Sequence, residues 1–106
     1  MLDSTKLLLY NTVMREVQFD WDQWNIQKNE IKHGISMLEA ESTFFDNKHI
    51  IFEDIKHSTN EKRYILFGMS TYNNILMIAF TIRNSKIRII SARKTSKKER
   101  SIYEKH

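Results

Sequence analysis

The sequence predicts an α+β fold in which two N-terminal helices pack on an antiparallel sheet of about four to five strands and a short helix ends the chain. Two observations support this prediction: apolar residues between about 23 and 47 have helical spacing, and those beyond Asn47 alternate. A length of 106 residues suits one domain with one core. We therefore expect a single domain over residues 17–106, preceded by an extension at 1–16.

The N-terminal extension fits two interpretations. Asp3 or Ser4 could cap a short helix, because the apolar residues that follow have roughly helical spacing. The stretch from Val13 to Trp21 also alternates as a strand does. Its later half alternates most clearly, which predicts a first strand at about residues 17–21.

A first helix is predicted over residues 23–32. Asp22 is a suitable N-cap for it. Lys32 and His33 place positive charge at the negative end of the helix dipole. Gly34 then supplies a residue that readily adopts the left-handed conformation at which helices end.

A second helix is predicted from Ser36 to about Phe45. Ser36 and Glu39 have the spacing of a capping box, in which each side chain accepts a hydrogen bond from the backbone of the other residue. The helical spacing of the apolar residues indicates which of them are buried. They are Met37, Ala40 and Phe44.

Alternating apolar residues predict four further strands and then a last helix. The strands are His49 to Glu53, Arg63 to Met69, Ile75 to Ile82 and Lys86 to Arg93. The last three form a meander, and the middle one belongs near the sheet centre because both of its faces are apolar. Ser96 and Glu99 repeat the capping-box spacing and begin a short C-terminal helix that carries Ile102 and Tyr103.

The composition excludes several classes of site. The chain has no Cys, so disulfides, thiolate metal sites and cysteine nucleophiles are absent. Its four His include no i, i+4 pair, and Asp20 and Asp22 are better explained as a strand residue and a helix cap than as magnesium ligands. No apolar run is long enough to span a membrane. We expect a soluble cytoplasmic protein with no membrane contact, no metal and no cofactor.

The charge is concentrated at the C-terminal end. Residues 83–106 contain nine Lys or Arg and two acidic residues, a balance of +7, whereas the first 82 residues carry −3. Clustered cations favour a polyanionic partner, although a solvated basic tail explains the same charge equally well. The basic residues that we expect to bind nucleic acid are Lys32, Lys94, Lys97, Lys98 and Arg100.

One set of residues has the composition needed for metal-independent RNA cleavage. This reaction requires a base for the 2′-hydroxyl, a cation for the charge on the phosphorane and an acid for the leaving oxygen. His57 or Glu61 could be the base, and Arg63, Arg88 and Arg93 could be the cations. On spacing alone, a structural explanation of these residues is stronger than a catalytic one. In it, His57 is a loop histidine, Glu61 and Arg63 form a surface pair, and the other arginines are solvated strand residues.

Several short motifs, taken together, resemble the BrnT toxins, which are ribonucleases of bacterial type II toxin–antitoxin modules. The matching stretches are Phe19-Asp20-Trp21-Asp22; Asn29-Glu30-Ile31-Lys32-His33-Gly34-Ile35-Ser36; Glu61-Lys62-Arg63 with Gly68 and Ser70; and Ile87-Arg88-Ile89-Ile90-Ser91-Ala92-Arg93-Lys94 followed by Lys97-Lys98-Glu99-Arg100 and Tyr103. They occur in the family's order. Each is weak alone, but their combination is quite specific.

The resemblance implies a RelE-like fold, endoribonuclease activity and neutralisation by a BrnA-type antitoxin, through whose complex the toxin reaches operator DNA. It makes Arg63 and Arg93 the first candidates for the active site, followed by His57, Glu61 and Arg88. The alternative is a domain that binds nucleic acid or a partner without catalysis, including an inactive relative of these toxins.

Two features depart from the family pattern. Gln23 and Asn25 stand where relatives often have Pro and Lys, so a basic contribution from the first helix is missing. Met14 stands where a family member would begin, and residues 1–13 precede that position.

Overall fold

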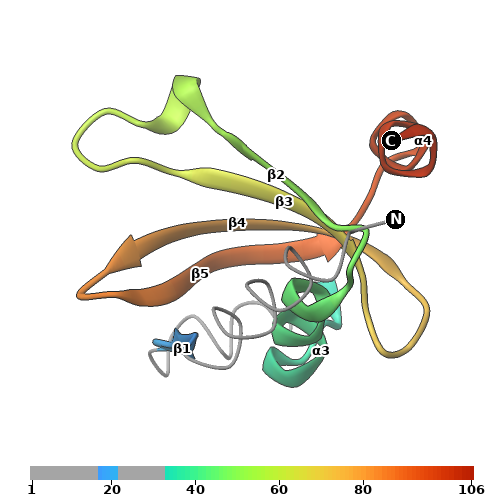
Figure 1. Ribbon diagram of the computed structural model, residues 1–106, viewed down its shortest axis with the longest axis horizontal. Helices are drawn as coiled ribbons and strands as arrows, with labels where there is room; N and C mark the ends of the chain where they lie inside the picture. The colour runs from blue at the N-terminus through green and yellow to red at the C-terminus, as the bar shows by residue number, and fades with distance from the viewer. Residues whose placement is uncertain (1–16, 22–32) are drawn as a thin grey trace, which may run out of the picture.

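The computed structural model describes residues 17–21 and 33–106, and its strands form one five-stranded sheet (Figure 1). The strands are β1 (Gln18–Phe19), β2 (Ile50–Glu53), β3 (Tyr64–Met69), β4 (Ile75–Arg83) and β5 (Lys86–Lys94). Their order in the sheet is β1-β5-β4-β3-β2. The predicted position of β4 at the centre of the sheet is therefore confirmed.

The sheet is mixed, so the prediction of a wholly antiparallel sheet was wrong. Strands β2 to β5 are antiparallel, but β1 runs parallel to β5, with Gln18 beside Lys86 and Phe19 beside Ile87. Hairpins set the direction of the later strands. No hairpin joins β1 to β5, because most of the chain separates them, and such a long crossover permits parallel pairing.

The β3–β4–β5 meander is confirmed, and the turn between β4 and β5 shows how its register is set. Asn84 and Ser85 both have positive φ, at 51° and 62°. Two successive left-handed residues are typical of a type I′ turn, whose twist matches that of the flanking strands. Asn84 and Ser85 are the two central residues of this turn.

The second predicted helix is present as α3 (Met37–Ser42), continued by the 3₁₀ turn η1 (Thr43–Phe45). Glu39 N donates to Ser36 Oγ at 3.1 Å, which confirms the N-cap. The reciprocal half of the capping box was wrong. The Glu39 carboxylate is buried and instead accepts from Ser70 Oγ at 2.7 Å and from Asn74 Nδ2 at 2.9 Å, so it joins α3 to the β3–β4 connection.

The first predicted helix, residues 23–32, lies outside the described residues. The conformation expected after it is confirmed, because Gly34 has a φ of +66°. This value lies in the left-handed region, where a residue without Cβ has no steric penalty.

The core lies between α3 with η1 and one face of the sheet. Phe44 is at its centre, 2% exposed, and its ring meets those of Phe19 and Phe80 edge to face at 5.3 and 5.1 Å. A bulge adds a residue to β5, since Ala79 pairs with Ser91 whereas Phe80 pairs with Ile89. The other buried apolar members of the core are Ile35, Ala40, Leu66, Leu76, Ile78, Ile89 and Ala92.

The C-terminal helix α4 (Lys97–Lys105) begins with the predicted capping box between Ser96 and Glu99. Tyr103 is buried and its hydroxyl donates to Asp46 Oδ2 at 2.5 Å, whereas Ile102 is exposed. Burial and the bond to Asp46 raise the pKa of Tyr103. Within the described parts of the chain, no helix has the length and apolarity to cross a membrane.

Candidate active site

One polar hollow gathers several of the predicted site residues. It has a volume of about 380 Å³ and lies where the connection between β2 and β3 meets the end of β4. In Figure 1 this connection and the β4–β5 turn lie at the same end of the sheet. We call it the loop hollow; its lining residues are His57, Thr59, Asn60, Glu61, Arg63 and Arg83.

The connection between β2 and β3 closes on itself through Ser58. Asp54 N donates to Arg63 O at 2.8 Å, which extends the β2–β3 ladder. Ser58 Oγ then donates to Asp54 O at 2.7 Å and accepts from Arg63 N at 2.9 Å. These bonds fold the intervening residues into a compact loop that brings His57 and Arg63 to one hollow.

His57 is paired with a carboxylate that the sequence analysis did not identify. It ends the 3₁₀ turn η2 (Ile55–His57), and its Nδ1 lies 2.7 Å from Asp54 Oδ2. The carboxylate accepts, so Nδ1 carries the proton and Nε2 is left as the basic nitrogen. The His57 side chain is 57% exposed, which leaves it open to a substrate. The spacing Asp-x-x-His predicts this contact only if the chain forms a 3₁₀ turn there, because such a turn places residues i and i+3 on the same side.

Glu61 is engaged by Arg83. Arg83 Nε donates to Glu61 Oε2 at 3.0 Å, and Arg83 Nη2 donates to Oε1 at 2.7 Å. These hydrogen bonds lower the pKa of Glu61, which makes it a weaker base than an unpaired glutamate. The hydrogen-bonding partner of Glu61 is therefore Arg83 and not Arg63. The spacing of these residues in the sequence did not indicate this pair.

Arg63 lines the loop hollow, and its guanidinium is available to a ligand. No hydrogen bond or ion pair from residues 17–21 or 33–106 engages its guanidinium, although Glu61 lies near enough to interact with it electrostatically. In the sheet, Arg63 lies opposite Thr81 of β4, because the residue that follows it, Tyr64, pairs with Phe80.

Arg88 belongs to the same row of the sheet. It pairs with Thr81 on the opposite side of β4 from Arg63, about 10 Å from it across two strand spacings. Arg88 Nη1 lies 3.7 Å from Asp20 Oδ2. The structure therefore places Arg88 next to the loop hollow but outside its lining.

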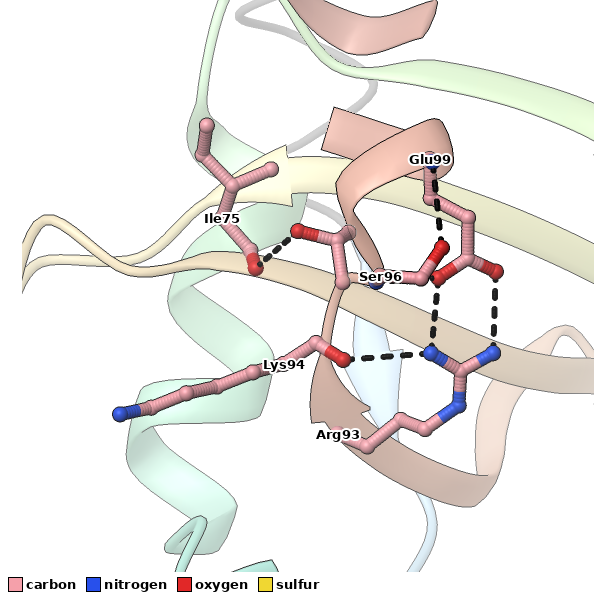
Figure 2. Close-up of polar contacts among 6 residues, drawn as sticks. Ile75, Arg93, Lys94, Ser96 and Glu99 are labelled. Carbon is pink, nitrogen blue, oxygen red and sulfur yellow. Dashed lines mark hydrogen bonds and ion pairs between the residues drawn. The ribbon is translucent and has the colours of Figure 1, made fainter. Parts of the chain in front are cut away.

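Arg93 is separated from the other candidates. It pairs with Met77, four residues from Thr81 along β4, which corresponds to about 13 Å. Figure 2 shows its guanidinium facing Glu99, with Nη1–Oε1 at 2.7 Å and Nη2–Oε2 at 2.9 Å. Hydrogen bonding to Arg93 lowers the pKa of Glu99 to about 2.

The predicted nucleic-acid contacts lie at the far end of β5 and on α4, except for Lys32, which lies outside the described residues. The described members Lys94, Lys97, Lys98 and Arg100 are all exposed. Across the described ranges, no group of three or more His, Cys, Asp or Glu residues could hold a metal ion.

Comparison with known proteins found a matching family model and similar solved structures. The model of a family described as the ribonuclease toxin BrnT of type II toxin–antitoxin systems matches residues 21–99. A crystal structure of the Brucella abortus ribonuclease toxin BrnT superposes with a TM-score of 0.58 at 24% identity, covering 76% of this chain and 99% of that one. This likeness shows the shared fold. A search of curated proteins found no match. Because the family match covers most of the sequence, including the loop hollow, the chain belongs to the BrnT family of ribonuclease toxins of type II toxin–antitoxin systems.

Proposed function

We propose that this chain is a toxin that cleaves RNA internally, without a metal ion, by attack of a 2′-hydroxyl on the adjacent phosphate. Membership of the BrnT family supports RNA as the substrate. The observation that carries the proposal is the loop hollow, which combines a carboxylate-paired histidine with an arginine available to a phosphate.

In the proposed reaction, His57 Nε2 takes the proton of the 2′-hydroxyl, and the 2′-oxygen attacks phosphorus. Asp54 holds the ring in the tautomer that makes Nε2 basic and stabilises the imidazolium that forms. Arg63 compensates the negative charge that develops on the phosphorane oxygens. The 5′-oxygen leaves and takes a proton from water in the open hollow. The products are a 2′,3′-cyclic phosphate and a 5′-hydroxyl.

The remaining candidates have supporting roles in this proposal. Glu61 accepts both hydrogen bonds from Arg83, so it fixes one wall of the hollow and does not act as the base. Arg88 is about 10 Å from Arg63, which suits a contact with a neighbouring phosphate rather than with the reacting one.

The proposed partners follow from the family. We propose that a BrnA-type antitoxin neutralises the protein in the cytoplasm and that operator DNA is bound only through their complex. The relation to RelE-like ribonucleases belongs to the same proposal; a sheet partly covered by α3 and η1 is compatible with it.

The decisive experiment is RNA cleavage by purified protein freed of any antitoxin, with the products identified chemically. We expect cleavage in the presence of a chelator and termini of the type described above. His57→Ala and Arg63→Ala should each reduce the rate by on the order of 10²-fold, by analogy with loss of a general base or of one oxyanion donor. Lys56→Ala is the matched control, because it removes a positive charge from the same loop without lining the hollow.

Two results would contradict this proposal. Activity that is lost in chelator and restored by Mg²⁺ would show metal-dependent chemistry. RNA binding without any cleavage would support the alternative, a non-catalytic relative of these toxins.

A further inference from the structure

A second polar hollow lies at the opposite end of the sheet from the loop hollow. It has a volume of about 250 Å³ and is formed by the β3–β4 connection, the end of β5 and α4. Figure 1 shows α4 and the β3–β4 connection at the end away from the β4–β5 turn. We call it the helix hollow; its lining residues are Asn73, Asn74, Ile75, Lys94, Arg100 and Glu104.

The helix hollow presents two cations, from Lys94 and Arg100. No hydrogen bond or ion pair within the described ranges uses the side-chain nitrogens of either residue, and both residues are exposed. In Figure 2 the Lys94 side chain extends away from the Arg93–Glu99 pair, as alternation along a strand requires. Both charges are therefore available to a ligand, and Glu104 is an acid beside them.

The wall of the helix hollow is fixed in advance. Asn74 Nδ2 donates to the buried carboxylate of Glu39, and Asn74 O accepts from Ser70 N at 2.8 Å. Asn73 is held in the left-handed region, with a φ of 63°. A polar hollow whose wall is already held by hydrogen bonds within the protein loses little conformational entropy when a ligand binds.

The two hollows lie at the two ends of β4. Ile75, its first residue, lines the helix hollow, and Arg83, its last, lines the loop hollow. Eight strand steps separate them, which is about 26 Å. Because this number is even, both residues belong to the same face of the sheet. On that face β5 adds Arg88 and Arg93 between the two ends. Lys94, the last residue of β5, pairs with Leu76 and so belongs to the opposite face, and RNA that follows the first face reaches Lys94 only by passing over the end of β5.

We infer that the helix hollow is a second phosphate site for the RNA substrate, contacted by Lys94 and Arg100 while the scissile phosphate lies in the loop hollow. The inference rests on the proposed function for its substrate class. A separation of about 26 Å corresponds to at most about eight stacked nucleotides. The helix hollow therefore contributes to binding only for RNA long enough to reach it.

The first test measures binding, so that it does not depend on cleavage. The probe is a fluorescent single-stranded RNA of about fifteen nucleotides, and the protein carries His57→Ala. Lys94→Gln and Arg100→Gln should each weaken binding roughly three- to tenfold and lower the slope of log affinity against log salt by about 0.7. Glu104→Gln should strengthen binding. Lys105→Gln, on the same helix but outside the hollow, is the control for loss of charge.

The second test separates binding from chemistry in the otherwise wild-type protein. On the long RNA, Lys94→Gln and Arg100→Gln should raise KM and leave kcat unchanged. On an RNA of about three nucleotides, too short to span the sheet, neither should change KM.

The inference is overturned if Lys94→Gln and Arg100→Gln affect binding no more than Lys105→Gln does, or if their losses are equal on the short and long RNA. Absence of RNA binding by the His57→Ala protein also overturns it. If the Lys94→Gln and Arg100→Gln variants show the expected loss of binding but the wild-type protein cleaves no RNA, the proposed function is refuted and this inference stands.

Discussion

Arg93 and Glu99 form a two-bond ion pair that fastens the end of β5 to the first turn of α4 (Figure 2). Glu99 Oε1 also accepts from Ser96 N at 2.8 Å, so one carboxylate both caps the helix and holds the arginine. Charge-assisted bidentate pairs are among the stronger hydrogen bonds in proteins. The position of α4, and with it the helix hollow, depends on this contact.

Glu99→Gln is expected to destabilise the fold at neutral pH and to flatten its acid dependence. The pKa of Glu99 is about 2 in the folded chain, below its ordinary value of 4.5. The ionised pair therefore contributes stability in full above pH about 4.5, and this contribution is lost as the pH falls towards 2. After allowance for solvent screening, we expect a loss of about 1–2 kcal/mol in the free energy of unfolding at pH 7.

Urea unfolding at pH 7 and at several values down to pH 2 measures both effects. The difference in stability between wild type and Glu99→Gln should shrink as the pH falls through this window. A difference that stays constant with pH would show that the charge of Glu99 is not what stabilises the contact.

Arg93→Ala is expected to lose no more cleavage than Glu99→Gln. Both variants break the same ion pair, and both terminal nitrogens of Arg93 are used by Glu99, about 13 Å along β4 from the row of Arg63. Single-turnover cleavage by the two variants, compared at matched folded fraction, measures this. A loss of on the order of 10²-fold that is confined to Arg93→Ala would instead make Arg93 a catalytic residue.

The strands could be predicted from the sequence because alternation and turn residues are local signals. The predicted ends of the last three strands lie within one residue of the observed ends. The direction of β1 could not be predicted in this way. Its pairing with β5 depends on how most of the intervening chain folds, which no short-range pattern encodes.

The candidate site was predictable in its residue types but not in its pairings. His57, Glu61 and Arg63 line one hollow, and their roles in catalysis stay a prediction. Asp54 and Arg83 were missed because their contacts depend on a 3₁₀ turn and on the strand register. Residues that are distant in sequence need the fold before their partners can be assigned.

Gly34→Val is expected to destabilise the protein by backbone strain alone. The φ of Gly34 is +66°, and a Cβ at this position would meet no atom within 4 Å. The left-handed conformation costs an L-residue about 1–2 kcal/mol, and more for a β-branched side chain. Gly34→Asn is the control, since Asn tolerates this conformation better than Val. Equal melting temperatures for wild type and Gly34→Val would contradict the assigned backbone conformation.

Gly68→Ala is expected to destabilise the protein for the opposite reason, which is lack of space. A Cβ there would lie 2.8 Å from Thr43 O and 2.9 Å from Leu66 Cδ2. Leu66 can adjust its side chain, but Thr43 is buried in η1 and its carbonyl belongs to the backbone, so η1 must shift away from β3. Overpacking of this kind costs about 1–3 kcal/mol. Equal free energies of unfolding for wild type and Gly68→Ala in urea would contradict this prediction, because they would show that η1 shifts at no energetic cost.

Removal of residues 1–13 is expected to leave RNA cleavage per soluble molecule unchanged. The family match begins at residue 21, and the motifs that resemble the family follow Met14. The deleted stretch has Asp3 and Lys6 as its only charged side chains, and neither completes the base and cation pair proposed for the loop hollow.

The apolar run from Leu7 to Tyr10 makes solubility a separate question. If this run packs on the rest of the protein, its removal exposes apolar surface, which promotes aggregation. The specific activity of the soluble fraction and its melting temperature therefore have to be measured together. Lower yield or melting temperature with full specific activity would assign the extension to stability. A stable truncated protein that binds RNA but no longer cuts it would instead place a necessary group within residues 1–13.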